Sequence, residues 1–288
     1  MTVVPILGAG SSMADYRIGF KWWALIIAVV FVISELVCVA CVPERPVACD
    51  EKPGKISDMF KALFKNDQAM TVVVSIILVY TSLNICGNLV LYFFRFDVGN
   101  EGAYSLFAAV AFAAQVLVMM VIPLLRKRFS KSQLFISGFI IQIAGFAVIL
   151  IMAFAKLYTP QSWYILCLPG ILIYLGYGML NVIMTIFLSD SVDYGEVMNG
   201  TREESVIFSM QTFTVKLASG VAVFLAGLVV DWIHLDTAAA VQTQDTLDAL
   251  RMWMTIPSVI LLIVGIFVFK RFYKLDDTRM EEIKSKLN

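Results

Sequence analysis

Charged residues are scarce in this chain of 288 residues. Asp, Glu, Lys and Arg together make up 15% of it, whereas 60% of the residues are hydrophobic. A water-soluble domain needs about a quarter of its residues charged to cover its surface, so the composition excludes a soluble globular protein. The formal net charge is zero. No strongly acidic or basic partner is therefore indicated, and nucleic acid is excluded as one.

Histidine is nearly absent, since His234 is the single example in the chain. This excludes a histidine-based catalytic or metal site. Cys38 and Cys41 form a C-x-x-C pair, but it falls in an apolar stretch without further Cys or His nearby, and we interpret both residues as small apolar filler. We find no nucleophile–base pair, phosphate-binding loop or metal-ligand set, which indicates that the chain is not an enzyme and needs no cofactor.

Long hydrophobic runs are abundant instead. A run of about 20 apolar residues spans the hydrocarbon core of a bilayer as a helix, because the core is about 30 Å thick and each residue rises 1.5 Å. We predict an all-α membrane protein with seven transmembrane helices. The predicted spans are 22–42, 69–94, 103–124, 133–155, 163–188, 205–231 and 251–270.

The positive charges sort by side of the membrane. Sixteen of the 22 Lys and Arg residues fall in the segments on one side of these spans and five on the other. Since cytoplasmic segments carry the excess of Lys and Arg, the N-terminus is predicted outside and the C-terminus in the cytoplasm of a cell membrane. The remaining cation, Lys216, lies within the sixth span.

Polar residues recur at helical spacing inside three spans. Asn84 and Asn88 share one face of the second span, Asn181 lies in the fifth, and Thr212 and Lys216 lie on a polar stripe of the sixth. Polar groups are costly against lipid, so these faces are expected to line the bundle interior or a water-filled cavity. Simple helix packing is the alternative for the small residues, but a functional role is favoured for Lys216.

Acidic residues follow the fifth span. Asp190, Asp193 and Glu196 lie at its C-terminal end, where the helix dipole disfavours negative charge, so a basic partner is expected. Arg202 is one candidate, and the basic run Arg126, Lys127 and Arg128 is the other. Gly195 and Gly200 predict a loop here, and Thr201 with Glu204 predicts a capping box that opens the sixth span. The segment is either a solvated loop or an ion-pair latch that closes the cytoplasmic side.

One long motif carries a resemblance to a known family. The pattern D-x-V-D-Y-G-E, an Arg six residues after the Glu, and then S-x-Q-x-x-x-x-K resembles the melibiose permease-like glycoside–pentoside–hexuronide:cation symporters of the major facilitator superfamily. The segments "YFFRFDVGN" and "FKRFYKLDD" are similar to that family as well. The matching residues of the long motif are Asp190, Val192, Asp193, Tyr194, Gly195, Glu196, Arg202, Glu204, Ser209, Gln211 and Lys216.

The resemblance implies a specific domain organisation. A complete member of the family has twelve helices in two six-helix halves. Residues 1–42 would then belong to the N-terminal bundle, 43–68 to the cytoplasmic middle loop, 69–270 to the six-helix C-terminal bundle and 271–288 to a cytoplasmic tail. The odd number of spans and the outside start predict that the chain begins inside a larger protein.

The implied function is cation-coupled sugar symport by alternating access, with this chain supplying the C-terminal half. The implied partners are a sugar, a monovalent cation (Na+ or H+), the lipid bilayer and the missing N-terminal half. Lys216, Asn181, Asn84, Asn88, Thr212 and Gln211 are expected to line the substrate or cation site. Asp190, Asp193, Tyr194, Glu196, Arg202 and Glu204 are expected to form the cytoplasmic gate.

One departure from the family and two alternatives remain open. Asn181 stands where melibiose permease-like carriers have a Trp, nine residues before the first Asp of the motif, so a different sugar preference is expected. An inactive truncated fragment is one alternative. A seven-helix receptor or photoreceptor, with Lys216 forming a Schiff base, is the other.

Overall fold

The computed structural model of the chain describes residues 13–41, 64–200, 202, 204–237, 239 and 241–287. The chain divides into two units, Met1–Gly54 and Lys55–Asn288. Within the described residues, seven helices are long and apolar enough to cross a membrane, and the predicted all-α architecture with seven spans is confirmed. Most of the middle loop 43–68 and the start of the chain lie outside the described residues.

The first unit contributes one described helix, α2 (Met13–Cys41). From residue 17 onward its side chains are exposed apart from Gly19, and the span Arg17–Cys41 has a mean hydropathy of 2.8. A helix that is apolar on all sides is suited to lipid or to further helices.

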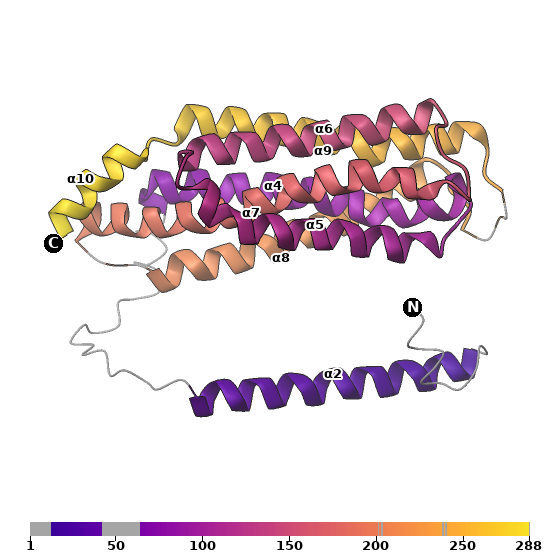
Figure 1. The fold of residues 1–288 in the computed structure, drawn as a ribbon, viewed down its shortest axis with the longest axis horizontal. Helices are drawn as coiled ribbons and strands as arrows, with labels where there is room; N and C mark the ends of the chain where they lie inside the picture. The colour runs from indigo at the N-terminus through magenta and orange to yellow at the C-terminus, as the bar shows by residue number, and fades with distance from the viewer. Residues whose placement is uncertain are drawn as a thin grey trace. The chain divides into compact units, whose positions relative to one another are not determined.

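The second unit is a bundle of six long helices that run side by side, with a short amphipathic helix, α10, projecting past one end (Figure 1). We call this end of the bundle the α10 end. The elements are α4 (Asp67–Tyr92), the π-helical turn η1 (Phe93–Asp97), α5 (Ala103–Leu125), α6 (Lys131–Phe154), the 3-10 turn η2 (Trp163–Leu166), α7 (Cys167–Asn199), α8 (Glu204–Trp232), α9 (Gln244–Phe272) and α10 (Asp277–Leu287).

Helix packing in the bundle follows a two-fold pattern. α4 packs mainly against α8 and α9, α7 packs mainly against α5 and α6, and contacts between α4 and α7 and between α6 and α9 join the two sets. Exchanging the triplet α4–α5–α6 with the triplet α7–α8–α9 leaves this pattern unchanged. Since each helix crosses opposite to the one before it, the triplets run in opposite directions, as inverted repeats do.

The α6–α7 and α4–α9 interfaces are equivalent in this pattern, but their backbones approach closely for different reasons. Between α6 and α7, a Cβ added to Gly176 would lie 2.5 Å from the carbonyl oxygen of Gly138 and 2.6 Å from the amide nitrogen of Gln142, so only glycine fits. Between α4 and α9, Ser258 donates its hydroxyl to the carbonyl of Ser82 at 2.8 Å, and Ser82 donates to the carbonyl of Ser258 at 3.1 Å. Small side chains at both interfaces let the backbones pack closely.

The fifth span continues further than predicted. α7 runs to Asn199 instead of ending near residue 188, so Asp190, Asp193, Tyr194 and Glu196 lie on a helix, and the predicted loop over them is wrong. Gly200, with φ +72°, ends the helix in the left-handed conformation that glycine tolerates. Gly195 does not break the helix. A Cβ there would approach the Asn66 amide to 2.8 Å, so this glycine serves helix packing.

Candidate functional site

A tyrosine–asparagine contact joins the polar faces of α4 and α7. Asn181 donates its side-chain amide to the Tyr80 hydroxyl at 2.5 Å, and the Tyr177 ring packs edge-on against Tyr80 with centroids 5.5 Å apart. Asn181 and Tyr80 are both only partly buried. Two polar side chains that are 101 positions apart in the sequence, on otherwise apolar helices, thus meet at one surface of the bundle.

Asn84 and Asn88 extend this polar surface along α4. Each donates its amide to the backbone carbonyl four residues earlier, at 2.7 Å, which uses the N–H side of both side chains within their own helix. Within the described residues, neither amide oxygen accepts a hydrogen bond. Asn88 also lines a cavity of about 250 Å³ between α4 and α8. The unused oxygens can accept hydrogen bonds from a hydroxylated ligand.

α8 supplies the remaining predicted lining residues. Gln211 donates to the Thr185 hydroxyl of α7 at 3.4 Å, while Thr212 donates to the carbonyl of Phe208 in its own helix at 3.4 Å. Lys216 is exposed, and in the part of the chain that the structure describes it makes no ion pair. A cation without an anion at this depth of an apolar helix is a functional-site candidate.

A large apolar cavity of the bundle does not coincide with these polar side chains. It has a volume of about 570 Å³ and is lined by apolar residues of α9 together with Ile85 and Leu225. None of the six predicted lining residues borders it. Among the described residues, no group of three or more His, Cys, Asp or Glu side chains is placed to hold a metal ion.

Five of the six predicted gate residues divide between two networks at the α10 end. In the first, Arg202 contacts Glu196 at 2.8 Å and Asp193 and Glu204 at 3.1 Å each, which ties the end of α7 to the start of α8. The hydrogen bond with Glu196 and those with the other two carboxylates raise the pKa of Arg202, outweighing its partial burial. The side chain is 47% exposed, so solvent weakens each of these contacts.

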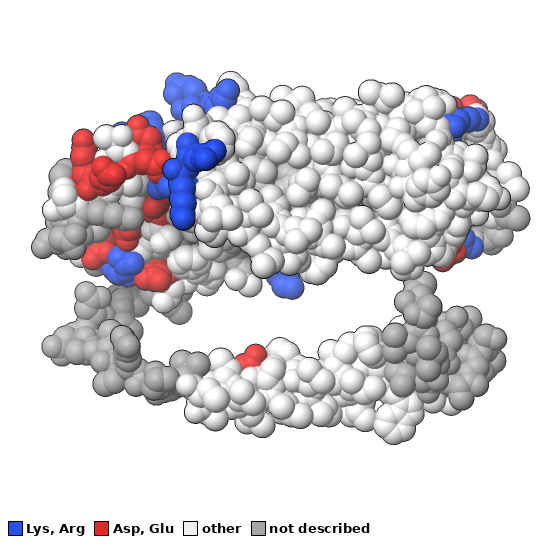
Figure 2. Space-filling view, viewed as in Figure 1, with Lys and Arg blue, Asp and Glu red and all other residues white. Residues whose placement is uncertain are grey.

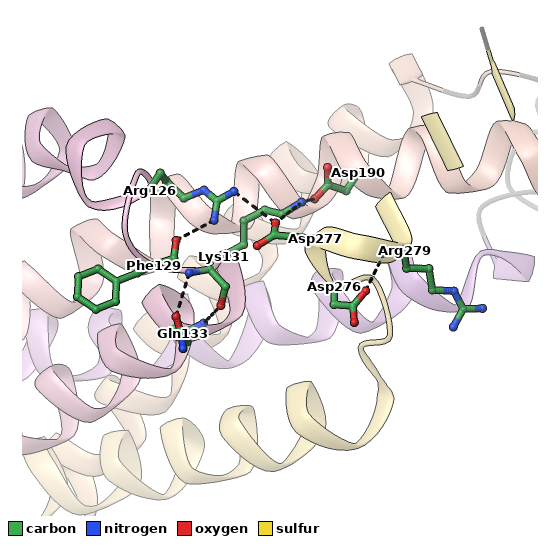
Figure 3. A network of polar contacts seen from close by, with 9 residues as sticks. Arg126, Phe129, Lys131, Gln133, Asp190, Asp276, Asp277 and Arg279 are labelled. Carbon is green, nitrogen blue, oxygen red and sulfur yellow. Dashed lines mark hydrogen bonds and ion pairs between the residues drawn. The ribbon is translucent and has the colours of Figure 1, made fainter. Parts of the chain in front are cut away.

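The second network is buried and centres on Lys131, the first residue of α6 (Figure 3). Lys131 forms an ion pair with Asp190 of α7, and their side chains are 8% and 7% exposed. Asp277 of α10 lies 3.4 Å from Lys131 and 3.3 Å from Arg126. Partial burial of Asp277 acts to raise its pKa, but the positive charges of Arg126 and Lys131 outweigh this and lower it.

Lys131 was missed from the sequence as the partner of Asp190. Arg202 and the basic run 126–128 were the expected partners, yet none of their side chains contacts Asp190 in the described residues. The available signal was its place directly after Ser130, whose hydroxyl caps α6 and so marks Lys131 as the first residue of that helix. Tyr194 lies in neither network and packs against Leu275, Met280 and Ile283.

A second buried ion pair lies at the opposite end of the bundle. Asp97 accepts hydrogen bonds from Arg251 Nε at 2.8 Å, Arg251 Nη2 at 2.6 Å and the Tyr158 hydroxyl at 2.7 Å. The side chains of Asp97 and Arg251 are 4% and 3% exposed, and Arg251 also contacts Asp248 at 2.7 Å. Burial, and then the hydrogen bond to Asp97, raise the pKa of Tyr158, which therefore stays protonated and donates.

The two buried pairs occupy equivalent places in the two triplets. Asp97 ends the α4–η1 span and pairs with Arg251, near the start of α9. Asp190 lies toward the end of α7 and pairs with Lys131, at the start of α6. In each case the end of the first helix of one triplet is tied to the start of the last helix of the other. In the sequence, Arg251 was one of the five cations assigned to the side opposite the cytoplasm, and its ion pair with Asp97 was not predicted.

Comparisons with known proteins agree with this architecture. A family model for MFS/sugar transport proteins matches residues 1–277. The uncharacterized symporter YjmB of Bacillus subtilis is 25% identical over 254 residues, which cover 88% of this chain and 54% of that protein. The raffinose carrier protein of Pediococcus pentosaceus is 23% identical over 292 residues, 99% of this chain and 44% of the relative.

The isoprimeverose transporter of Lactiplantibacillus pentosus is 25% identical over 279 residues, 96% of this chain and 56% of the relative. The chain thus spans about half the length of the curated relatives it matches. The resemblance seen in the sequence is confirmed at the level of the family. With seven membrane-length helices, an internal inverted repeat and a family match over almost its whole length, this multi-pass membrane protein belongs to the MFS/sugar transport protein family.

Proposed function

We propose that the chain provides the C-terminal half of a cation-coupled sugar symporter that works by alternating access. Family membership and the names of the relatives support sugar as the cargo, since these include a raffinose carrier, an isoprimeverose transporter and a lactose permease. Inverted triplets are the unit from which such transporters build a site near the midplane of the membrane.

One observation carries this proposal: a polar face on α4, α7 and α8 lies within otherwise apolar spans. The Asn181–Tyr80 and Gln211–Thr185 contacts connect the three helices, and Lys216 lies exposed on α8. Amides, hydroxyls and an ammonium group are the donors and acceptors that recognise sugar hydroxyls. Because Asn181 offers an amide rather than a stacking ring, the site selects its sugar by hydrogen bonds.

Lys216, which makes no ion pair within the described residues, supports the proposal that a second half completes the site. An ammonium group facing lipid would be expensive, whereas one facing a carboxylate or a bound sugar is stabilised. We assign Lys216 to the interface between the halves, where it binds sugar hydroxyls or balances the carboxylates that hold Na+ or H+. The coupling cation itself would be bound mainly by that second half.

The Arg202 network is the part of the bundle that changes its contacts during the transport cycle. The Arg202 network is exposed, joins α7 to α8 across Gly200, and is suited to breaking and re-forming. In this proposal the end with the C-terminus lies in the cytoplasm, which the excess of Lys and Arg on that side supports. In this scheme the Arg202 contacts form when the cytoplasmic side closes and part when it opens.

Sugar uptake tests the proposal. The chain is expressed in cells lacking sugar uptake, alone and with the N-terminal half of the isoprimeverose transporter, and uptake of raffinose, lactose and isoprimeverose is followed under an imposed Na+ or H+ gradient. Gradient-driven uptake is expected only with both halves. Lys216→Ala should abolish it, whereas the matched variant Lys270→Ala, at the exposed end of α9, should leave it unchanged. Wild-type uptake by the Lys216→Ala variant would overturn the assignment.

A further inference from the structure

A polar pocket lies at the α10 end, between the α5–α6 loop and α10. It has a volume of about 490 Å³ and is open to the surface. Its lining includes four cations within six residues of the chain, Arg126, Lys127, Arg128 and Lys131, and two acids of α10, Asp277 and Glu281. The sugar-site proposal uses neither the pocket nor the loop, so this pocket is independent of it.

The four cations differ in what they already bind. Lys131 pairs with Asp190 and Asp277, and Arg126 with Asp277 and the carbonyl of Phe129, so these two cations are committed to the protein. Lys127 and Arg128 are exposed, and their side chains make no ion pair or hydrogen bond within the described residues. The loop side of the pocket therefore presents two uncompensated cations, while Asp277 on the α10 side is already neutralised by Arg126 and Lys131.

The surroundings of the loop are those of a membrane interface. α5 ends at Leu125 and α6 begins at Lys131, so the loop lies where two spans leave the hydrocarbon. On α5 just before it, Met120 is 70% exposed and Leu124 is 61% exposed. Charged side chains gather at the ends of the bundle, and the surface between them is almost entirely uncharged (Figure 2).

Phe129 adds an apolar anchor between the cations and the lipid-facing surface. It is 47% exposed, and its ring points away from the Lys131–Asp190–Asp277 cluster, whereas Arg126 and Lys131 point toward Asp277 (Figure 3). An aromatic ring at this depth is suited to the boundary between headgroups and acyl chains. A free anion would gain nothing from such neighbours, but a lipid gains contacts for both its headgroup and its chains.

We propose that this pocket binds the phosphate of an anionic phospholipid headgroup, through Lys127 and Arg128, with the acyl chains against the exposed face of α5. Basic pockets between transmembrane helices are suited to such headgroups, and each cation near an anionic membrane surface contributes about 1 kcal/mol. Removing both cations should therefore weaken binding about 30-fold, since 1.4 kcal/mol is a factor of ten.

Lipid titration measured by native mass spectrometry tests the site. The purified chain in detergent is titrated with dioleoyl-phosphatidylglycerol or with dioleoyl-phosphatidylcholine, which has the same acyl chains. We expect one phosphatidylglycerol molecule bound at least tenfold more tightly than phosphatidylcholine. Lys127→Gln/Arg128→Gln should weaken phosphatidylglycerol about 30-fold and phosphatidylcholine much less, because the choline ammonium already offsets the charge of that lipid's phosphate.

A matched control removes the same charges elsewhere. Lys270→Gln/Arg271→Gln takes an adjacent Lys and Arg from the exposed end of α9, at the same end of the bundle, and should change phosphatidylglycerol binding less than threefold. Glu281→Gln removes the acid of the pocket that makes no ion pair within the described residues. It should strengthen binding several-fold, which a variant that merely misfolds cannot do.

Three results would overturn the proposal. Equal binding of the two lipids would show that the site does not distinguish an anionic headgroup from a zwitterionic one. An equal loss in both double variants would show only a general effect of positive charge. Competition by inorganic phosphate at the same concentration as phosphatidylglycerol would assign the pocket to free anions rather than to lipid.

Discussion

The buried pair of Asp97 and Arg251 leads to a quantitative prediction for Arg251→Met. The substitution removes two hydrogen bonds to Asp97, at 2.6 Å and 2.8 Å. Among the described residues, this leaves the Tyr158 hydroxyl as the only donor to a carboxylate that is 4% exposed. Removing one partner of a buried ion pair typically lowers the free energy of unfolding by about 3–5 kcal/mol. For a chain of this size each kcal/mol corresponds to about 2–4 °C, so we expect a fall of about 10 °C in the unfolding midpoint.

Cys86 provides the assay, because this residue is 7% exposed and its thiol becomes reactive only when the bundle opens. In a background with the other four cysteines changed to Ser, a thiol-reactive fluorescent dye reports the midpoint in detergent. Adding Asp97→Asn to Arg251→Met should restore more than half of the loss, since the D97N amide is neutral and its oxygen still accepts from Tyr158.

The control for this prediction is Arg95→Met. The Arg95–Glu101 pair is 3.7 Å long, with side chains 45% and 49% exposed, and such pairs contribute little to stability. We expect a midpoint within about 2 °C of the parent. If Arg251→Met lowers the midpoint no further than Arg95→Met, or if the double variant is no more stable than Arg251→Met alone, the reasoning about the buried charge is wrong.

Three further predictions concern packing, pH and the polar face. Gly176→Ala should destabilise the bundle by about 2 kcal/mol by dye labelling, because backbone atoms surround the site, whereas Gly87→Ala, with nothing within 4 Å, should be neutral or slightly stabilising. The pKa of Asp277 is lowered, so its pairing stabilises the fold above the ordinary Asp pKa and is lost as pH falls through the lowered value. The midpoint difference between wild type and Asp277→Asn should accordingly hold from pH 8 to 5 and shrink below about pH 4; a constant difference down to pH 2 would contradict it. Asn181→Leu should raise the KM for sugar about fivefold at an unchanged midpoint, and an unaltered KM would remove Asn181 from the site.

The hydropathy of the sequence and its few charges alone determined how many membrane-spanning helices the chain forms. The seven apolar runs form seven membrane-length helices. An apolar run can be recognised locally, because the thickness of the bilayer fixes how many apolar residues a spanning helix needs. The motif from Asp190 to Lys216 likewise identified the family, which the match over residues 1–277 confirms. Periodicity also found Asn84, Asn88 and Asn181, whose side chains do lie on partly buried faces of α4 and α7, while their role in binding stays a prediction.

Only the tertiary structure decided which charges meet. Lys131 and Asp190 are 59 positions apart, and Asp97 and Arg251 are 154 apart, so no local pattern could pair them.

The tertiary structure also decided where α7 ends. Gly195 and Gly200 predicted a loop, and acids are disfavoured at a helix C-terminus. The ion pair of Asp190 with Lys131 and the fit of Gly195 against Asn66 nevertheless stabilise the helix up to Gly200. Contacts between helices outweigh local preference there, because a buried charge is stable only beside its partner.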